Sequence, residues 1–436
     1  MGVISYSKVD RDFAGGIYLE PLGVSPCLDD IEVVRGPATL RLPLRVGRGE
    51  VMEPVVGQGE RVSTGQLLAK GGHFRLFAPR AGVVGERQSV WAEGRSDQPA
   101  LTLHAEAAAE QVEAAGSGDH LALGPAQADR WAVLERIAEA GIVLAETGEP
   151  LAERLRGLAE AKVRAVVANA NPLEADLTGP LAIMRHWPEQ VFAGLAILKR
   201  WLGAEAGLVA YPVNFAIDEA TAALWQVRCL AVSEKYPQGR GDAVLRTLAR
   251  QRHLPGGRRR KERSLVVGVQ MLRELERALF AERMPTERLV TVSGDGVDRP
   301  MQFLAPVGLA LMALLERAGL RADARCVVEG SSLAGVAVEA AEAVVSATSE
   351  SFTAIREAPR QRPQACIRCG WCIDDCPAGI DPARLLELGE LGQYQQAREI
   401  GLDACIECGI CSHVCPSHLR IMEYIRMIKS QVHHGS

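Results

Sequence analysis

The sequence predicts a protein of several domains that mixes α/β and α+β architecture. Three observations carry this prediction: glycine-punctuated apolar stretches in the first quarter, alternating helical and strand patterns in the middle, and a repeated cysteine motif near the C-terminus. The chain has 436 residues, of which 47% are hydrophobic, so it can bury sizeable cores in about three domains.

Residues 1–104 are predicted to form a β module with an N-terminal extension. Between residues 41 and 86, glycines separate short apolar stretches at intervals of roughly 5–10 residues, which is typical of strands joined by tight turns. The sequence at 56–68, followed by Ala-Pro-Arg-Ala-Gly-Val-Val at 78–84, resembles the barrel-sandwich hybrid fold of biotinyl and lipoyl carriers. Those carriers present one lysine at a hairpin tip, whereas Lys70 ends a strand-like run, so we do not expect a swinging-arm role.

An α/β domain is predicted for residues 129–285, after an Ala/Gly/Glu-rich linker at 105–128. Helical and strand patterns alternate here, which indicates a largely parallel sheet. The expected elements are a helix at 132–140, a strand at 164–168, a helix at 188–202 and a strand at 207–211. For residues 286–357, a strand and turn at 288–296 and a helix at 306–318 suggest a small β-grasp-like domain of the SLBB type.

Two matching cysteine runs dominate the C-terminal segment, residues 358–436. Eight of the eleven cysteines lie in them, each run reads Cys-x2-Cys-x2-Cys-x3-Cys-Pro, and the runs begin 39 residues apart. This spacing holds [4Fe–4S] clusters, and the fourth cysteine of each run serves the other cluster. A pair of structural zinc sites is disfavoured, because zinc takes four ligands, usually from two separated Cys-x2-Cys pairs, and the third cysteine would be surplus.

The predicted ligands therefore form two exchanged sets. The first cluster is assigned to Cys366, Cys369, Cys372 and Cys415, and the second to Cys405, Cys408, Cys411 and Cys376. Each run precedes a predicted helix, at 382–391 and 419–429, so the segment is an internal repeat that forms a two-cluster ferredoxin-like helical module. Replacing Cys376 or Cys415 with serine is predicted to impair the cluster held mostly by the other run.

Composition limits the partners and the compartment. A net charge of −5 and 5% aromatic residues argue against nucleic-acid binding. Iron–sulfur thiolates need a reducing compartment, and the sequence shows no signal-peptide pattern and no apolar stretch near ~20 residues, so we expect a cytoplasmic protein without a transmembrane segment. The remaining cysteines, Cys27, Cys229 and Cys326, are expected to be small buried hydrophobic residues.

Further motifs resemble the RnfC family, which belongs to the Rnf (Rsx) complex, a membrane-associated complex that exchanges electrons between NAD and ferredoxin. They include Gly-Gly-Ile at 15–17, His-Trp-Pro-Glu at 186–189 and Lys-Tyr-Pro-Gln-Gly at 235–239, in family order with the cysteine runs. The resemblance implies that the α/β domain is Rossmann-like, binds FMN and NADH, and supplies electrons to the clusters. It also implies peripheral attachment to the cytoplasmic membrane through a partner.

The chain departs from that family at both nucleotide elements. The family has a glycine-rich loop after residues 140–143, but this chain has Leu-Ala-Glu-Thr-Gly-Glu-Pro-Leu at 144–151, with Glu146 and Glu149 beside Gly148. A phosphate cradle needs glycines, because they let the backbone turn so that successive N–H groups point at the anion. In the second element Asn169 and Glu174 stand at matching positions, while its glycine, one acid and its proline are displaced or lost.

Three functions are consistent with these residues. The preferred one is an electron-transfer subunit that relays electrons through two [4Fe–4S] clusters between redox proteins, in a membrane-bound Rnf-type complex or a soluble reductase, without oxidising NADH itself. The second is an FMN-dependent NADH dehydrogenase subunit of an NAD:ferredoxin oxidoreductase with a rebuilt loop. The third is a subunit that interacts with a quinone in the altered pocket. No catalytic side chain is predicted.

Overall fold

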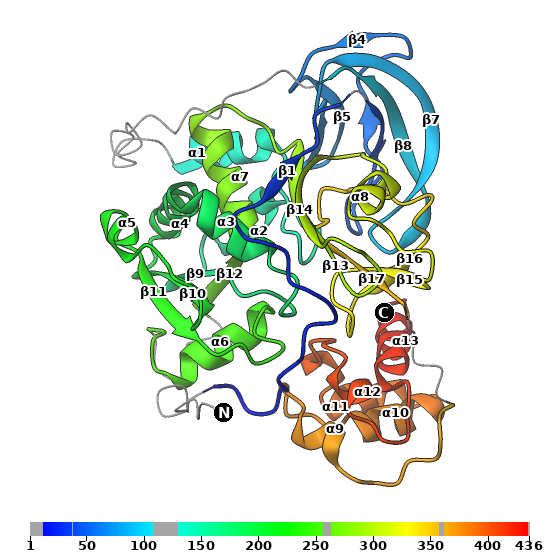
Figure 1. The fold of residues 1–436 in the computed structure, drawn as a ribbon. Helices are drawn as coiled ribbons and strands as arrows, with labels where there is room; N and C mark the ends of the chain where they lie inside the picture. Colours follow the sequence, from blue (N-terminus) through cyan, green and yellow to red (C-terminus); the bar gives the residue numbers. More distant parts are fainter. Residues whose placement is uncertain (1–11, 37, 108–129, 256–262, 357–361, 435–436) are drawn as a thin grey trace.

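The computed structural model describes residues 12–36, 38–107, 130–255, 263–356 and 362–434 (Figure 1). In Figure 1 a β-rich part lies at the upper right, an α/β part at the left and a small helical part below them. The architecture is therefore a mixed α/β arrangement of several parts, as predicted. Most of the linker at 105–128 lies outside the described residues.

The first part is the all-β module that the glycine spacing predicted. Its strands are β2 (Ala38–Pro43), β3 (Glu53–Pro54), β4 (Arg61–Val62), β5 (Leu67–Gly71), β6 (Phe74–Phe77), β7 (Gly82–Ala92) and β8 (Arg95–Ala105). They form a four-stranded sheet in the order β2-β8-β7-β4 and a three-stranded sheet in the order β3-β5-β6. Lys70 lies within β5, and its cross-strand neighbours are Glu53 on β3 and Arg75 on β6.

The α/β part contains a parallel sheet with the strand order β11-β10-β9-β12. Its strands are β9 (Ala165–Asn169), β10 (Ala206–Pro212), β11 (Arg228–Val232) and β12 (Ser264–Gly268). Its helices are α1 (Arg130–Ala140), α2 (Leu151–Leu158), α3 (Gly179–His186), α4 (Pro188–Leu202), α5 (Glu219–Leu224), α6 (Gly241–Arg250) and α7 (Val269–Phe280). The predicted helix at 188–202 and the strands near 164 and 207 are confirmed.

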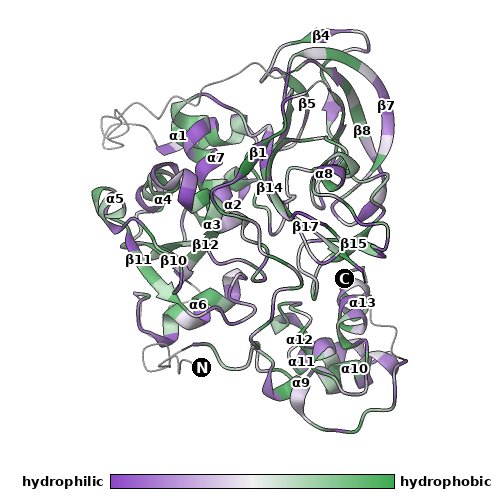
Figure 2. Ribbon diagram, viewed as in Figure 1, coloured by the Kyte–Doolittle hydropathy of each residue, from purple (hydrophilic) through white to green (hydrophobic). Residues whose placement is uncertain are grey.

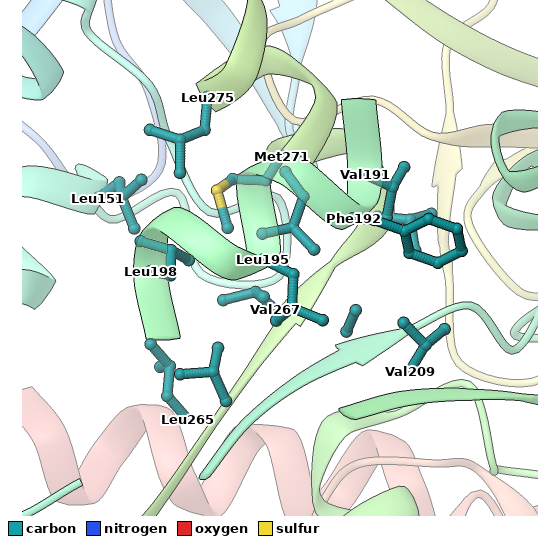
Figure 3. Packing of buried hydrophobic residues seen from close by; sticks show 14 of the residues in the cluster. Leu151, Val191, Phe192, Leu195, Leu198, Val209, Leu265, Val267, Met271 and Leu275 are labelled. Atoms are coloured by element: carbon teal, nitrogen blue, oxygen red, sulfur yellow. The ribbon is translucent and has the colours of Figure 1, made fainter. Parts of the chain in front are cut away.

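Every residue of β9 is buried because helices cover both faces of the sheet. Side chains alternate between faces along a strand, so Val166 packs in the core with α4 and α7, while Val167 packs with α6 on the opposite face. Figure 3 shows Leu195 of α4 and Met271 of α7 meeting over the sheet. The strands of this sheet are largely hydrophobic in Figure 2.

A mixed six-stranded sheet, ordered β1-β14-β13-β17-β15-β16, forms the next part. Its elements are β1 (Ile31–Val33), β13 (Glu287–Ser293), β14 (Met301–Pro306), α8 (Leu311–Arg317), β15 (Cys326–Glu329), β16 (Val336–Val338) and β17 (Ser351–Ile355). The helix expected at 306–318 begins only at Leu311. Residues up to Pro306 belong to β14. The chain then turns at Gly308, which has a left-handed φ of 86° and packs against the backbone of Arg41, before the helix begins.

A buried ion pair links this sheet to the α/β part. Arg288 on β13 donates to Glu274 on α7 at 2.7 Å, and the two side chains are only 2% and 4% exposed. Glu350 lies 3.8 Å from the same guanidinium.

The C-terminal part is helical and has its own small core. It contains α9 (Trp371–Asp374), α10 (Pro382–Glu390), α11 (Tyr394–Glu399), a 3-10 turn at Leu402–Ala404, α12 (Ile410–His413) and α13 (Ile421–His434). The helices predicted at 382–391 and 419–429 are thus confirmed as α10 and α13. Across the described ranges, no helix is long and apolar enough to span a membrane.

The N-terminal segment joins these parts rather than staying with the β module. Gly16 donates its N–H to the carbonyl of Asp375 at 2.8 Å, and Ile17 forms an isolated antiparallel β-bridge with Tyr236 of the α/β part. Further along, β1 pairs in parallel with β14. In Figure 1 this dark blue segment runs from the helical part up to the six-stranded sheet.

Candidate metal centre

The two cysteine runs adopt the same backbone conformation. Arg368 and Glu407, at equivalent positions, have left-handed φ angles of 55° and 54°, and Gly370 and Gly409 follow with 85° and 82°. A one-turn helix, α9 or α12, comes next in each run. Left-handed conformations are unfavourable for residues other than glycine and gather at functional sites. The repeat found in the sequence is therefore a repeat of structure.

Each run also directs a backbone N–H at its first thiol. Arg368 donates to Sγ of Cys366 at 3.4 Å, and Glu407 donates to Sγ of Cys405 at 3.4 Å. Hydrogen bonds to sulfur favour the thiolate and tune the potential of a bound cluster.

The fold brings the last cysteine of the first run to the second run. A cavity beneath α13 is lined by Cys376, Cys405, Cys408 and Cys411, together with apolar side chains such as Met422 and Ile425. Within the described ranges, no three His, Cys, Asp or Glu side chains lie close enough together for a single metal ion. Four thiols in an apolar cavity are the donor set that an iron–sulfur cluster takes, so the residues fit this group.

The set proposed for the first cluster, Cys366, Cys369, Cys372 and Cys415, is the more exposed one. The charges that act on Cys372 are those of Asp381, Cys369 and Cys415. Cys366 and Cys369 are exposed, whereas Cys372 is buried. Burial raises the pKa of Cys372 to about 11, helped by the charges of Asp381 and Cys369, so ligation at neutral pH requires the metal to displace the thiol proton.

The α/β part covers the second run. The hydroxyl of Tyr236 donates to the carbonyl of Cys408 at 2.5 Å, and the guanidinium of Arg240 donates to the carbonyl of Glu407 at 3.2 Å. The first run instead exposes Ile367 and Trp371, at 67% and 54%. The sequence marked residues 235–239 only as a family motif, because no local pattern signals a contact between Tyr236 and Cys408, 172 positions apart.

The two residues retained from the second nucleotide element are engaged by the protein itself. The amide of Asn169 donates to the carbonyl of Gly239 at 2.7 Å. The carboxylate of Glu174 is 7% exposed and accepts hydrogen bonds from residues 331–333 of the six-stranded part.

The altered loop at 144–149 closes on itself. The N–H of Leu144 donates to Glu149, the N–H groups of Thr147 and Gly148 both donate to the carbonyl of Leu144, and that of Glu149 donates to the hydroxyl of Thr147. Gly148 also packs on Gly47 of the β module, so a Cβ added to Gly148 would lie 2.7 Å from the Cα of Gly47. These N–H groups are therefore satisfied without an anion.

Glu146 adds an exposed carboxylate to this loop. Desolvation raises its pKa to about 7 and the charge of Glu350 adds to the shift, although part of the side chain reaches solvent.

The expectation that the three remaining cysteines are buried was wrong. Cys27 is exposed, and Cys229 and Cys326 are partly exposed. Cys27 lies in the extended N-terminal segment, Cys229 lies on the edge strand β11, and Cys326 begins β15. Apolar neighbours in the sequence therefore did not imply a core position.

Comparison with known proteins agrees with this geometry. A family model described as a 4Fe-4S dicluster domain matches residues 365–421, which include both cysteine runs. The chain is 29% identical over 97% of its length to the C subunit of the ion-translocating oxidoreductase complex of Yersinia enterocolitica, and it covers 62% of that protein. The resemblance to RnfC is confirmed.

Other C subunits of this complex match equally broadly. The protein of Yersinia pestis is 28% identical over 97% of this chain, with 69% of its own length covered, and that of Klebsiella pneumoniae is 29% identical over 97%, with 57% covered. This chain thus spans about three fifths to two thirds of the length of these RnfC relatives.

Among solved structures, an NAD+-reducing [NiFe]-hydrogenase in the air-oxidized state aligns with a TM-score of 0.46 and 16% identity. The alignment covers 69% of this chain and 61% of that one, a likeness too low to support an argument about function.

Proposed function

We propose that the chain is an iron–sulfur electron-transfer subunit of an Rnf-type complex, which relays electrons between protein partners without oxidising NADH itself. The observation that carries the proposal is the convergence of Cys376 with Cys405, Cys408 and Cys411 in one apolar cavity. Cys366, Cys369, Cys372 and Cys415 would hold the other cluster. When bound, each [4Fe–4S] cluster takes up and releases one electron at a time.

The surroundings of the two ligand sets support a path from the interior to the surface. The cavity set includes Cys408 and Cys411, both buried, and Tyr236 covers it from the α/β part. The other set includes two exposed cysteines beside the exposed side chain of Trp371. A redox partner therefore has access to the first cluster, while the second lies between the first and the rest of the protein.

The absence of NADH oxidation is supported by both altered nucleotide elements. A phosphate needs N–H donors, and the loop at 144–149 uses those of Leu144, Thr147, Gly148 and Glu149 internally. A carboxylate about 4 Å from a phosphate charge adds a repulsion of about 4 kcal/mol at an effective dielectric near 20, so the ionised form of Glu146 would oppose phosphate binding in this loop. FMN and NADH are accordingly not expected to bind.

The finer architecture belongs to the same proposal. Residues 1–104 would form a barrel-sandwich hybrid module, 129–285 a Rossmann-like domain, 286–357 an SLBB-type β-grasp domain and 358–436 the two-cluster ferredoxin-like module. Membrane association would come through another protein of the complex.

Anaerobic purification tests the proposal on one sample, by iron and sulfide analysis, acid-released flavin and reduction by NADH or dithionite. The expected result is about eight irons per chain, no flavin, and clusters that dithionite reduces and NADH does not. One FMN per chain with NADH-driven cluster reduction would instead identify an NADH dehydrogenase subunit with a rebuilt loop.

A further inference from the structure

Residues 331–333 form a loop, here called the brace loop, that is fixed by one buried carboxylate. The hydroxyl of Ser331 donates to Glu174 at 2.7 Å, and that of Ser332 donates to it at 3.0 Å. The backbone N–H groups of Ser332 and Leu333 donate at 3.1 and 3.2 Å. With four donors around it, this carboxylate determines where the loop lies.

The brace loop in turn contacts the second cysteine run. The hydroxyl of Ser331 lies 3.4 Å from that of Tyr236, which donates to the carbonyl of Cys408. The carbonyl of Leu333 packs against Gly409 so closely that an added Cβ would lie 2.2 Å from it. A continuous chain of contacts therefore runs from Glu174 to the peptide that carries a cluster ligand.

The first cysteine run provides an internal comparison. Gly370 is the counterpart of Gly409 and has the same left-handed conformation, yet an added Cβ there would meet nothing within 4 Å. The two runs therefore share their backbone conformation but differ in this contact.

We propose that Glu174 and Tyr236 are positioning residues that set the redox potential of the cluster held by Cys405, Cys408, Cys411 and Cys376, and leave the other cluster unaffected. The inference rests on the proposed function, because it presupposes that both clusters bind. It assigns a new role to Glu174, a residue of the altered nucleotide element.

The two side chains act on the potential in opposite directions. The Tyr236 hydroxyl places the positive end of its dipole toward the Cys408 peptide, which favours the more negative, reduced cluster. The Glu174 carboxylate adds negative charge to the same network and disfavours reduction. Loss of the hydroxyl should therefore lower the potential, and loss of the charge should raise it.

The test is a potentiometric titration of both clusters, followed by electron paramagnetic resonance, in wild type, Tyr236→Phe and Glu174→Gln. We expect one of the two transitions to move down in Tyr236→Phe and up in Glu174→Gln, by about threefold to tenfold in its equilibrium constant. A tenfold change equals about 59 mV for one electron. Tyr211→Phe, a buried tyrosine in the α/β core, is the matched control and should move neither transition.

A transition that stays in place in both variants, or two transitions that move together, would overturn the inference while the proposed function stands. A wild-type chain that binds no clusters would overturn both, and the iron analysis distinguishes these cases.

A second pair of variants keeps the test independent of hydrogen bonding. Gly409→Ala and Gly370→Ala introduce the same left-handed strain, but only Gly409→Ala displaces the brace loop. Each glycine follows a ligand of a different cluster, so each variant is compared on the transition of its own cluster. The inference requires that Gly409→Ala move its own transition more than Gly370→Ala moves the other, and equal shifts would contradict it.

Discussion

Removing the thiol of Cys376 tests the exchange of ligands between the cysteine runs. Cys376 belongs to the first run in the sequence but lines the cavity with Cys405, Cys408 and Cys411. Alanine is the sharper substitution, because a serine oxygen can itself bind iron. With one of four thiolates gone, one cluster should be lost, and the iron content should fall from about eight to about four per chain.

Double variants identify which cluster is lost. Cys376→Ala combined with Cys408→Ala removes two ligands of the same proposed set, so about four irons should remain. Cys376→Ala combined with Cys369→Ala removes a ligand from each set, so almost none should remain. Two substitutions at one cluster site cost no more iron than one, whereas substitutions at two independent sites cost the iron of both clusters.

The assay is iron and acid-labile sulfide per chain after anaerobic purification, with circular dichroism to confirm folding. Cys27→Ala is the control, because Cys27 is exposed and lies outside both runs, and it should retain the full iron content. The reverse pattern, in which the Cys376/Cys369 pair keeps four irons and the Cys376/Cys408 pair keeps none, would assign each cluster to its own run and refute the exchange.

Three further predictions concern stability. Gly148→Ala should destabilise the protein by about 1–2 kcal/mol or more in thermal or urea unfolding, because its Cβ would lie 2.7 Å from the β module at a φ of 69°, whereas Gly157→Ala, with open space around it in α2, should be neutral or stabilise by about 0.5–1 kcal/mol. Glu274→Gln should lower the unfolding free energy by about 3 kcal/mol. This is the lower end for breaking a buried ion pair, because Glu350 remains 3.8 Å from Arg288, and a loss below about 1 kcal/mol would show that the pair contributes little to stability. Burial raises the pKa of Glu329 to about 7 from 4.5, so the folded state holds its proton at higher pH than the unfolded state, and the unfolding free energy should fall as pH rises through this window. Glu329→Gln should flatten that slope, and an unchanged slope would contradict the assignment.

Local patterns predicted the elements that depend on local physics. The helix at 188–202 matches α4, because proline opens it and glycine ends it, and apolar residues recur along the face that packs on the sheet. The cysteine spacing predicted the repeat, because three ligands two residues apart impose one backbone path. The helix start at Leu311 was missed, since the turn at Gly308 depends on packing against Arg41 of another strand.

What the sequence could not predict are contacts between parts that lie far apart in the chain. Nothing near Tyr236 indicates that its hydroxyl reaches Cys408, or that the N-terminal segment adds β1 to a distant sheet. Both depend on how whole domains pack. The motif at 235–239 was visible, but only the fold shows what its tyrosine touches.

The packing of Glu174 gives the α/β domain a role that does not require a bound nucleotide. In the proposed relay the domain has no cofactor to hold, yet the carboxylate still orders the brace loop, and Tyr236 still holds the peptide of Cys408. A domain that only covered the clusters could tolerate substitution at both positions with little effect. If the potential of one cluster depends on them as inferred, these two residues give the α/β domain a direct part in the electron path.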